Sequence, residues 1–134
     1  MIREIKGFSL MELMIVIVLI GILSAGGIIF FGSRAEQARI EAAKVSTSSI
    51  RLLQQEYKSN NGSYYYTSAG CSSTTTQQII SELFDGSKEL AEKDFYYCIS
   101  GKPNSDTFKI TAKSIKNNCQ VMRDEKNNIT ESNC

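Results

Sequence analysis

The sequence predicts an α+β fold in which a long N-terminal helix packs on a small antiparallel β-sheet. Three observations predict this fold. Residues 13–33 form an uncharged run rich in Ile, Leu, Val and Met, and helix-forming residues without Gly or Pro follow from Ser33 to Ser59. Beyond Phe95, apolar and polar residues alternate, which is typical of strands with one buried face.

The uncharged run is long enough to span a membrane. As a helix it would extend about 31 Å, and Arg3 and Lys6 before it would keep the N-terminus in the cytoplasm. A cleaved signal peptide or a plain anchor is the common alternative. The run is longer than the apolar core of most signal peptides and leads directly into helix-forming sequence, so we expect it to stay attached.

The start of this run carries a distinctive motif: a basic leader, Gly7, Phe8 and then Glu12 within "GFSLMELMIVIVLIGILSA". This motif resembles the class III signal of type IV pilins and of the pseudopilins of type II secretion. The resemblance extends over residues 1 to about 30. It implies that a prepilin peptidase cuts on the cytoplasmic side between Gly7 and Phe8 and methylates the new amino group of Phe8.

The resemblance also implies how the chain is organised. Residues 1–7 would be the leader peptide, and residues 8–35 the hydrophobic half of the helix, used first for membrane anchoring and then for polymerisation. Residues 36–134 would form the globular head, which includes the C-terminal half of the helix.

Glu12 is an ionisable residue at the edge of the apolar run. A carboxylate in a low-dielectric helix bundle is costly unless it is paired or protonated. The resemblance supplies a cation, the ammonium of Phe8 in the same chain or in a neighbouring subunit, and this pair would set the axial register of a filament. The alternative is that Glu12, about one turn into the helix, only reaches the membrane surface.

The helix departs from many pilins because Ile29 stands where they carry a proline, and the only proline is Pro103. The span instead contains Gly21, Gly26, Gly27 and Gly32. Each weakens a helix by about 1 kcal/mol relative to Ala, and glycines also permit close helix packing. We expect a bend or local melting near Gly26 and Gly27 on assembly; packing alone is the open alternative.

The second half of the helix has two weakly apolar faces at helical spacing. They are formed by Ala38, Ala42, Val45, Ser49 and Leu52, and by Ile40, Ala43, Thr47, Ile50 and Tyr57. Two faces suit two partners, namely the protein's own head and the helices of neighbouring subunits. A single wide face toward the core is the simpler alternative.

The long helix should end at Asn60–Gly62, since Asn and Gly tolerate the left-handed conformation that ends helices. In the connecting region 63–94, a short helix is predicted around Ile79, Ile80, Leu83 and Phe84, ending at Gly86. Strands are predicted at 95–100, 107–113 and 119–124. The tail from Asn128 adds an edge strand or wraps as a loop.

Four cysteines, Cys71, Cys98, Cys119 and Cys134, all follow the apolar run. Their even number beyond a membrane segment suggests disulfides in an oxidising compartment, where three pairings are possible. The preferred pairs are Cys71 with Cys98 and Cys119 with Cys134, which would stabilise a small core. In pilins, a C-terminal loop held in this way is exposed on the filament. Free thiols and a metal site are the alternatives, but the chain has no CxxC pair and no His.

The composition argues against an enzyme. The chain has no His and no Gly-rich phosphate loop after a strand, so we expect no catalytic residues, no cofactor and no metal. The net charge of +1 indicates no nucleic-acid face, and we interpret Tyr64, Tyr65 and Tyr66 as core or interface residues; DNA binding is conceivable but not indicated.

The resemblance therefore implies a structural subunit of a type IV pilus, a helical homopolymer serving adhesion, twitching motility or DNA uptake. Its partners would be copies of itself, the prepilin peptidase and the inner-membrane pilus assembly machinery. It would reside in the inner membrane before assembly and outside the cell afterwards. The alternatives are a minor pilin or type II secretion pseudopilin and, from another class, a membrane-tethered binding domain that never polymerises.

Overall fold

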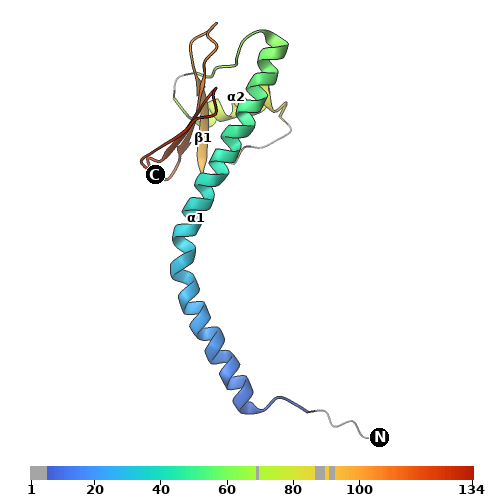
Figure 1. Cartoon of the computed structure of the whole chain (residues 1–134), viewed down its shortest axis with the longest axis vertical. Helices are drawn as coiled ribbons and strands as arrows, with labels where there is room; N and C mark the ends of the chain where they lie inside the picture. Colours follow the sequence, from blue (N-terminus) through green and yellow to red (C-terminus); the bar gives the residue numbers. More distant parts are fainter. Residues whose placement is uncertain (1–5, 69, 87–89, 91–92) are drawn as a thin grey trace, which may run out of the picture. The chain divides into compact units, whose positions relative to one another are not determined.

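The computed structural model describes residues 6–68, 70–86, 90 and 93–134. Within them the chain forms α1 (Leu10–Asn61), α2 (Ser73–Leu83), β1 (Phe95–Ser100), β2 (Lys109–Ser114), β3 (Gln120–Asp124) and β4 (Ile129–Ser132) (Figure 1). The chain divides into two compact units, Met1–Gln37 and Ala38–Cys134, and α1 contributes to both. The predicted α+β class is confirmed.

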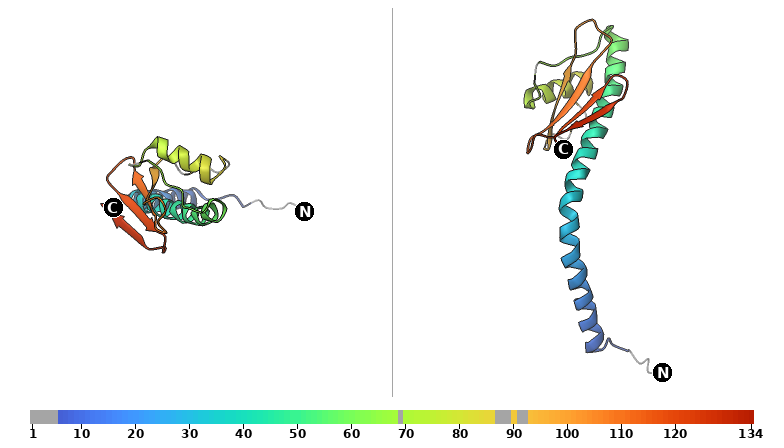
Figure 2. Two further views of the ribbon diagram at one scale, coloured as in Figure 1. Left: turned by 90° about the horizontal axis from the view of Figure 1, so that it is seen from above. Right: turned by 60° about the vertical axis from the view of Figure 1, so that its left-hand side comes forward.

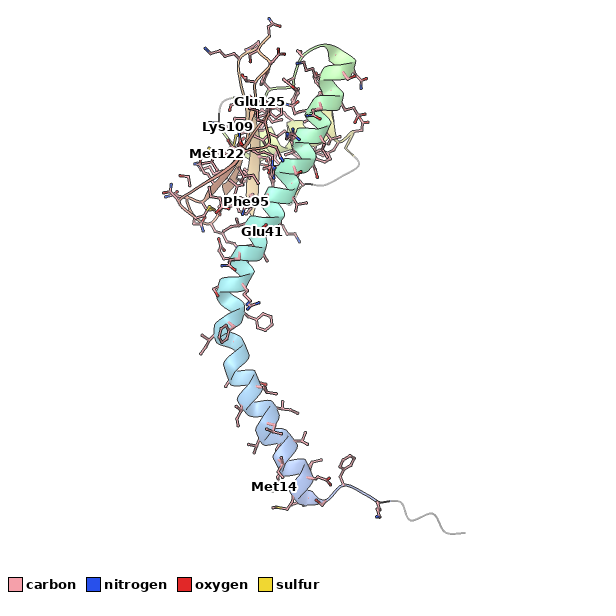
Figure 3. The ribbon with its side chains drawn as sticks, viewed as in Figure 1. Met14, Glu41, Phe95, Lys109, Met122 and Glu125 are labelled. Carbon is pink, nitrogen blue, oxygen red and sulfur yellow. A yellow bond between two sulfur atoms is a disulfide. The ribbon has the colours of Figure 1, made fainter. Side chains whose placement is uncertain are left out.

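The first unit holds the apolar half of α1. Its large apolar side chains between Leu10 and Phe31 are 49% to 81% exposed, as the sticks around Met14 illustrate (Figure 3). By length and composition α1 is able to cross a membrane. The helix continues without interruption through Gly26 and Gly27, and the bend or melting expected there on assembly stays a prediction.

In the second unit, only one of the two predicted faces of α1 is buried. Ala43, Thr47 and Ile50 lie in the core, whereas Val45 and Leu52 on the other face are 67% and 60% exposed. The alternative of a single wide core face is therefore wrong. The exposed face is left without a partner among the head residues that the structure describes.

The predicted short helix is confirmed as α2, which starts after a capping box. Ser72 accepts from the backbone N–H of Thr75, and the Thr75 hydroxyl accepts from the backbone N–H of Ser72. At the other end, Gly86 adopts a φ of 68° and donates its N–H to the carbonyl of Ile80 at 3.0 Å. This left-handed residue satisfies a carbonyl of the last turn, as in many helix ends.

The four strands form an antiparallel sheet in the order β1-β2-β3-β4. Tyr97 pairs with Ala112, and Ala112 pairs with Val121, so these buried residues line one face of the sheet. Within the second unit, this face packs on α2 and on the end of α1 (Figure 2). The tail forms β4 rather than a loop.

Threonine residues form hydrogen bonds with the backbone groups at the free edge of β1. The Thr75 hydroxyl donates to the carbonyl of Tyr97 at 2.8 Å, and the Tyr97 N–H donates to the hydroxyl of Thr76 at 2.9 Å. Further along, Thr67 donates its N–H to the carbonyl of Ile99 and accepts the N–H of Ile99, both at 3.0 Å. These bonds occupy groups that would otherwise invite pairing with another strand.

Two disulfides join Cys71 to Cys98 and Cys119 to Cys134, over sequence separations of 27 and 15 residues. These are the pairs preferred from the sequence, and no cysteine is free. The first ties the segment before α2 to β1, and the second ties the C-terminus to the residue before β3. Each cross-link lowers the conformational entropy of the unfolded chain. In the chain-entropy model this stabilises the folded state by roughly 3 kcal/mol for a 15-residue loop.

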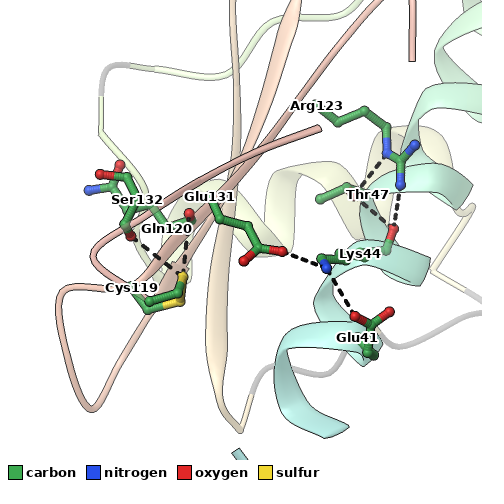
Figure 4. Close-up of polar contacts among 9 residues, drawn as sticks. Glu41, Lys44, Thr47, Cys119, Gln120, Arg123, Glu131 and Ser132 are labelled. Atoms are coloured by element: carbon green, nitrogen blue, oxygen red, sulfur yellow. Dashed lines mark hydrogen bonds and ion pairs between the residues drawn. A yellow bond between two sulfur atoms is a disulfide. The ribbon is translucent and has the colours of Figure 1, made fainter. Parts of the chain in front are cut away.

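Hydrogen bonds and an ion pair connect the β3–β4 hairpin to α1 (Figure 4). The residues involved are Arg123 and Glu131 of the hairpin and Lys44 and Thr47 of α1. The buried Arg123 donates from Nε to the Thr47 hydroxyl and from Nη2 to the carbonyl of Lys44, both at 3.1 Å. Burial lowers the pKa of Arg123. Lys44 lies 2.5 Å from Glu131, and its hydrogen bonds to Glu131 and Glu41 raise its pKa.

Candidate functional site

The predicted cleavage site lies in a non-helical segment. Residues 6–9 precede α1, which begins at Leu10, and Gly7 is exposed. The side chain of Phe8 is 86% exposed. Exposed chain outside a helix is the kind of substrate that peptidases cut, so the geometry is compatible with cleavage between Gly7 and Phe8.

Ser9 and Glu12 form a capping box at the start of α1. The backbone N–H of Ser9 donates to Oε2 of Glu12 at 3.3 Å, and the backbone N–H of Glu12 donates to Oγ of Ser9 at 3.2 Å. The Ser9 carbonyl accepts the first helical hydrogen bond from Leu13 at 3.2 Å. This reciprocal arrangement satisfies backbone donors that a helix N-terminus otherwise leaves unpaired.

The capping box gives the Glu12 carboxylate a defined position. Oε2 is turned back to the N–H of Ser9, the residue that follows Phe8. Oε1 makes no hydrogen bond or ion pair to any residue in the described part of the chain and is available for a second donor. A carboxylate in the first turn is also favoured by the positive end of the helix dipole.

Sequence reasoning singled out Glu12 but missed Ser9. The signal was present, because Ser9 and Glu12 have the S-x-x-E spacing of a capping box immediately before an apolar run. The structure brings these two residues together. The pairing of Glu12 with a processed Phe8 stays a prediction, as does the alternative that Glu12 only reaches the membrane surface.

Comparison with family models identifies this segment. Residues 2–28 match the model described as the prokaryotic N-terminal methylation motif. The chain carries the class III signal characteristic of type IV pilins and pseudopilins. The match includes Gly7, Phe8, Ser9 and Glu12, but it ends at residue 28 and leaves the head outside it. The comparisons with curated proteins and with solved structures found no match.

The tyrosine run of the head packs against the core. The Tyr64 ring meets Phe108 edge-on with centroids 4.6 Å apart, and Tyr65 meets Tyr57 edge-on at 5.5 Å. The Tyr66 hydroxyl donates to the carbonyl of Thr107 at 3.0 Å. These rings are only partly exposed, which disfavours an open stacking platform for nucleic-acid bases.

Proposed function

We propose that this chain is the structural subunit of a type IV pilus and polymerises through the apolar half of α1. The observation that carries this proposal is the Glu12 carboxylate, which the Ser9 capping box fixes beside the predicted cut within a matched methylation motif. The motif supports processing by a prepilin peptidase and handling by pilus assembly machinery.

Cleavage would change the charge beside Glu12. Hydrolysis of the peptide bond between Gly7 and Phe8 converts a neutral amide nitrogen into an ammonium, which keeps its positive charge after methylation. This cation would pair with Glu12 of its own chain or of a neighbouring subunit. Because an unpaired charge between packed helices is strongly destabilising, the pair would fix one axial register.

The exposed surfaces of α1 provide the packing for such a polymer. The apolar side chains from Leu10 to Phe31 suit a lipid environment before assembly and neighbouring helices afterwards. In the head, Val45 and Leu52 are further exposed apolar side chains of α1. The chain would therefore move from the inner membrane to an extracellular filament, where it would serve adhesion, twitching motility or DNA uptake.

A minor pilin or a type II secretion pseudopilin is the second candidate, because the matched motif is shared by both classes. The disulfide at the C-terminus favours a pilus subunit, since Cys134 is exposed and closes a loop at the surface of the head. The number of copies per filament distinguishes the two roles. A tethered binding domain that never polymerises is the third.

The direct experiment replaces Glu12 with Ala and compares the chain in sheared surface filaments with the chain in the membrane. Glu12→Ala should be inserted and cleaved, but its filament yield should fall at least about tenfold, because an unpaired buried charge costs about 3–5 kcal/mol. The control Glu41→Ala, on the same helix but in the head, should assemble as wild type does. Normal filaments from Glu12→Ala would contradict the proposal.

A further inference from the structure

A groove with a mixed polar and apolar lining lies in the second unit between the last turns of α1 and α2. It consists of two adjoining hollows of about 330 and 390 Å³. Its lining joins the apolar or aromatic side chains of Leu52, Leu53, Tyr57, Leu83 and Phe84 to the neutral polar side chains of Ser49, Asn60 and Asn61. Leu52 is 60% exposed, so part of this apolar surface faces solvent in the isolated chain.

Three carboxylates surround the groove, those of Glu56, Glu82 and Asp85. All three residues are exposed, and none of the three carboxylates forms an ion pair or hydrogen bond with a residue that the structure describes. Both helices also end here, and a helix C-terminus carries partial negative charge. The groove therefore has negative charge that the described part of the head does not neutralise.

The opposite side of the head presents unpaired positive charge. Lys109 and Lys113 on β2 are exposed and form no ion pair with a described residue, whereas Ile110 and Ala112 between them are buried against the helices. The two lysines therefore point away from the helical layer. Asp124 lies across from Lys109, but the side chain and backbone N–H of Asn128 bind its carboxylate.

This basic sheet face also offers apolar surface. Tyr96 lies across from Lys113, and Met122 lies across from Thr111, between the two lysines. Both Tyr96 and Met122 are half-buried. The face thus combines the cations of Lys109 and Lys113 with the single carboxylate of Asp124 around a moderately apolar centre. Its net positive charge complements the acidic groove, whose lining is part apolar and part polar.

We propose that the acidic groove of one head receives the basic sheet face of a second copy of this chain. The inference rests on the proposed function, since it concerns contacts between subunits of a polymer. The two surfaces belong to opposite layers of the head, so the contact is heterologous. Repetition of such a contact builds an open helical filament when its rotation does not close into a ring, and it cannot form a two-fold dimer. The charges select the register and orientation of neighbouring heads.

The test reverses the charges on each side separately and then on both. Glu56→Lys with Glu82→Lys, and Lys109→Glu with Lys113→Glu, should each lower the yield of sheared filaments at least about tenfold, because juxtaposed like charges cost several kcal/mol. The variant with all four substitutions restores opposite charges and should recover to within about twofold of wild type.

Matched controls reverse charges outside the two surfaces. Lys102→Glu with Lys126→Glu changes two exposed turn lysines, and Glu125→Lys changes a carboxylate in the β3–β4 turn. Both controls should assemble normally. Thermal unfolding in detergent establishes that each variant is folded. If a reversed variant is unfolded, the neutral pairs Glu56→Gln with Glu82→Gln and Lys109→Gln with Lys113→Gln should each reduce filament yield.

The inference is overturned if either folded double variant assembles normally, or if the fourfold variant assembles as poorly as the doubles. The fourfold variant would assemble as poorly as the double variants if the groove binds a partner other than the basic sheet face. These outcomes are separate from failure of the proposed function. If Glu12→Ala abolishes filaments while the charge reversals have no effect, only the contact between heads is wrong; if wild type forms no filaments, the proposed function itself fails.

Discussion

Ser9 and Glu12 each accept the other's backbone N–H, at 3.2 and 3.3 Å, and so define where α1 begins. The predicted cut falls before Phe8, so processing removes neither residue. The carboxylate is therefore already in place when the new ammonium appears. Ser9 is a positioning residue in this account, because it acts on assembly through Glu12.

Ser9→Ala should remove the hydrogen bond that positions Glu12 without changing the charge of the Glu12 carboxylate. Loss of a helix N-cap costs about 1 kcal/mol, so filament yield should fall roughly fivefold, less than in Glu12→Ala, while cleavage continues. Ser9→Thr keeps the hydroxyl and should assemble as wild type does. Quantification of sheared filaments checks this prediction. Equal yields from Ser9→Ala and wild type would show that the capping box has no part in assembly.

Gln54 should be the polar residue on which the head depends most. It is fully buried, and its side-chain amide donates to the carbonyl of Tyr65 at 2.7 Å and accepts the Tyr65 N–H at 2.9 Å. Gln54→Leu would leave both backbone groups buried and unpaired, which should cost about 2–4 kcal/mol. Its exposed neighbour Gln55 provides the matched control, and Gln55→Leu should leave the Tm in detergent unchanged.

Gly101 should not tolerate a side chain. A Cβ at this position would lie 2.2 Å from the Tyr66 ring and 2.9 Å from the carbonyl of Thr107. Gly101→Ala must displace Tyr66 and should destabilise the head by about 1–3 kcal/mol. Gly32→Ala is the control for this unfolding measurement, because no atom outside the local helix backbone and the neighbouring residues lies within 4 Å of the new Cβ. A Gly101→Ala chain with the wild-type Tm would show that Tyr66 does not pack here.

The β3–β4 turn should weaken in acid. Hydrogen bonds from Asn128 hold the pKa of Asp124 below its ordinary value of 3.8. The folded state thus favours the ionised carboxylate, and this stabilisation is complete above pH 3.8 and is lost as the pH falls through the lower folded value. Asp124→Asn should lower the Tm at pH 6 yet lose less stability than wild type between about pH 5 and pH 2. Parallel Tm curves for the two chains would contradict this assignment.

Much of the fold is predictable because its signals are local. The uncharged run, the alternation in β2 and the helical spacing of Ile79, Ile80 and Leu83 each specify an element within a few residues. The motif around Gly7 and Phe8 is also contiguous. The capping box is equally local, since Ser9 and Glu12 have the S-x-x-E spacing within a single turn.

The remaining features depend on residues that are distant in the sequence. Nothing near Arg123 indicates that its guanidinium is buried against Thr47, 76 positions away. Gln54 and its exposed neighbour Gln55 are the same residue type on the same helix. Only the hydrogen bond between Gln54 and the backbone of Tyr65, in the segment after the helix, distinguishes them. The acidic groove likewise requires two helix ends to meet, so its carboxylates appear in the sequence as ordinary solvated residues.

The most direct test of the account is the intact mass of this chain recovered from sheared surface filaments. We predict an abundant species that begins at Phe8, carries one methyl group on its terminal nitrogen, and contains two disulfides. Chains that begin at Met1, chains that begin beyond the apolar run, or a processed chain found only as a single unit in the membrane would contradict it.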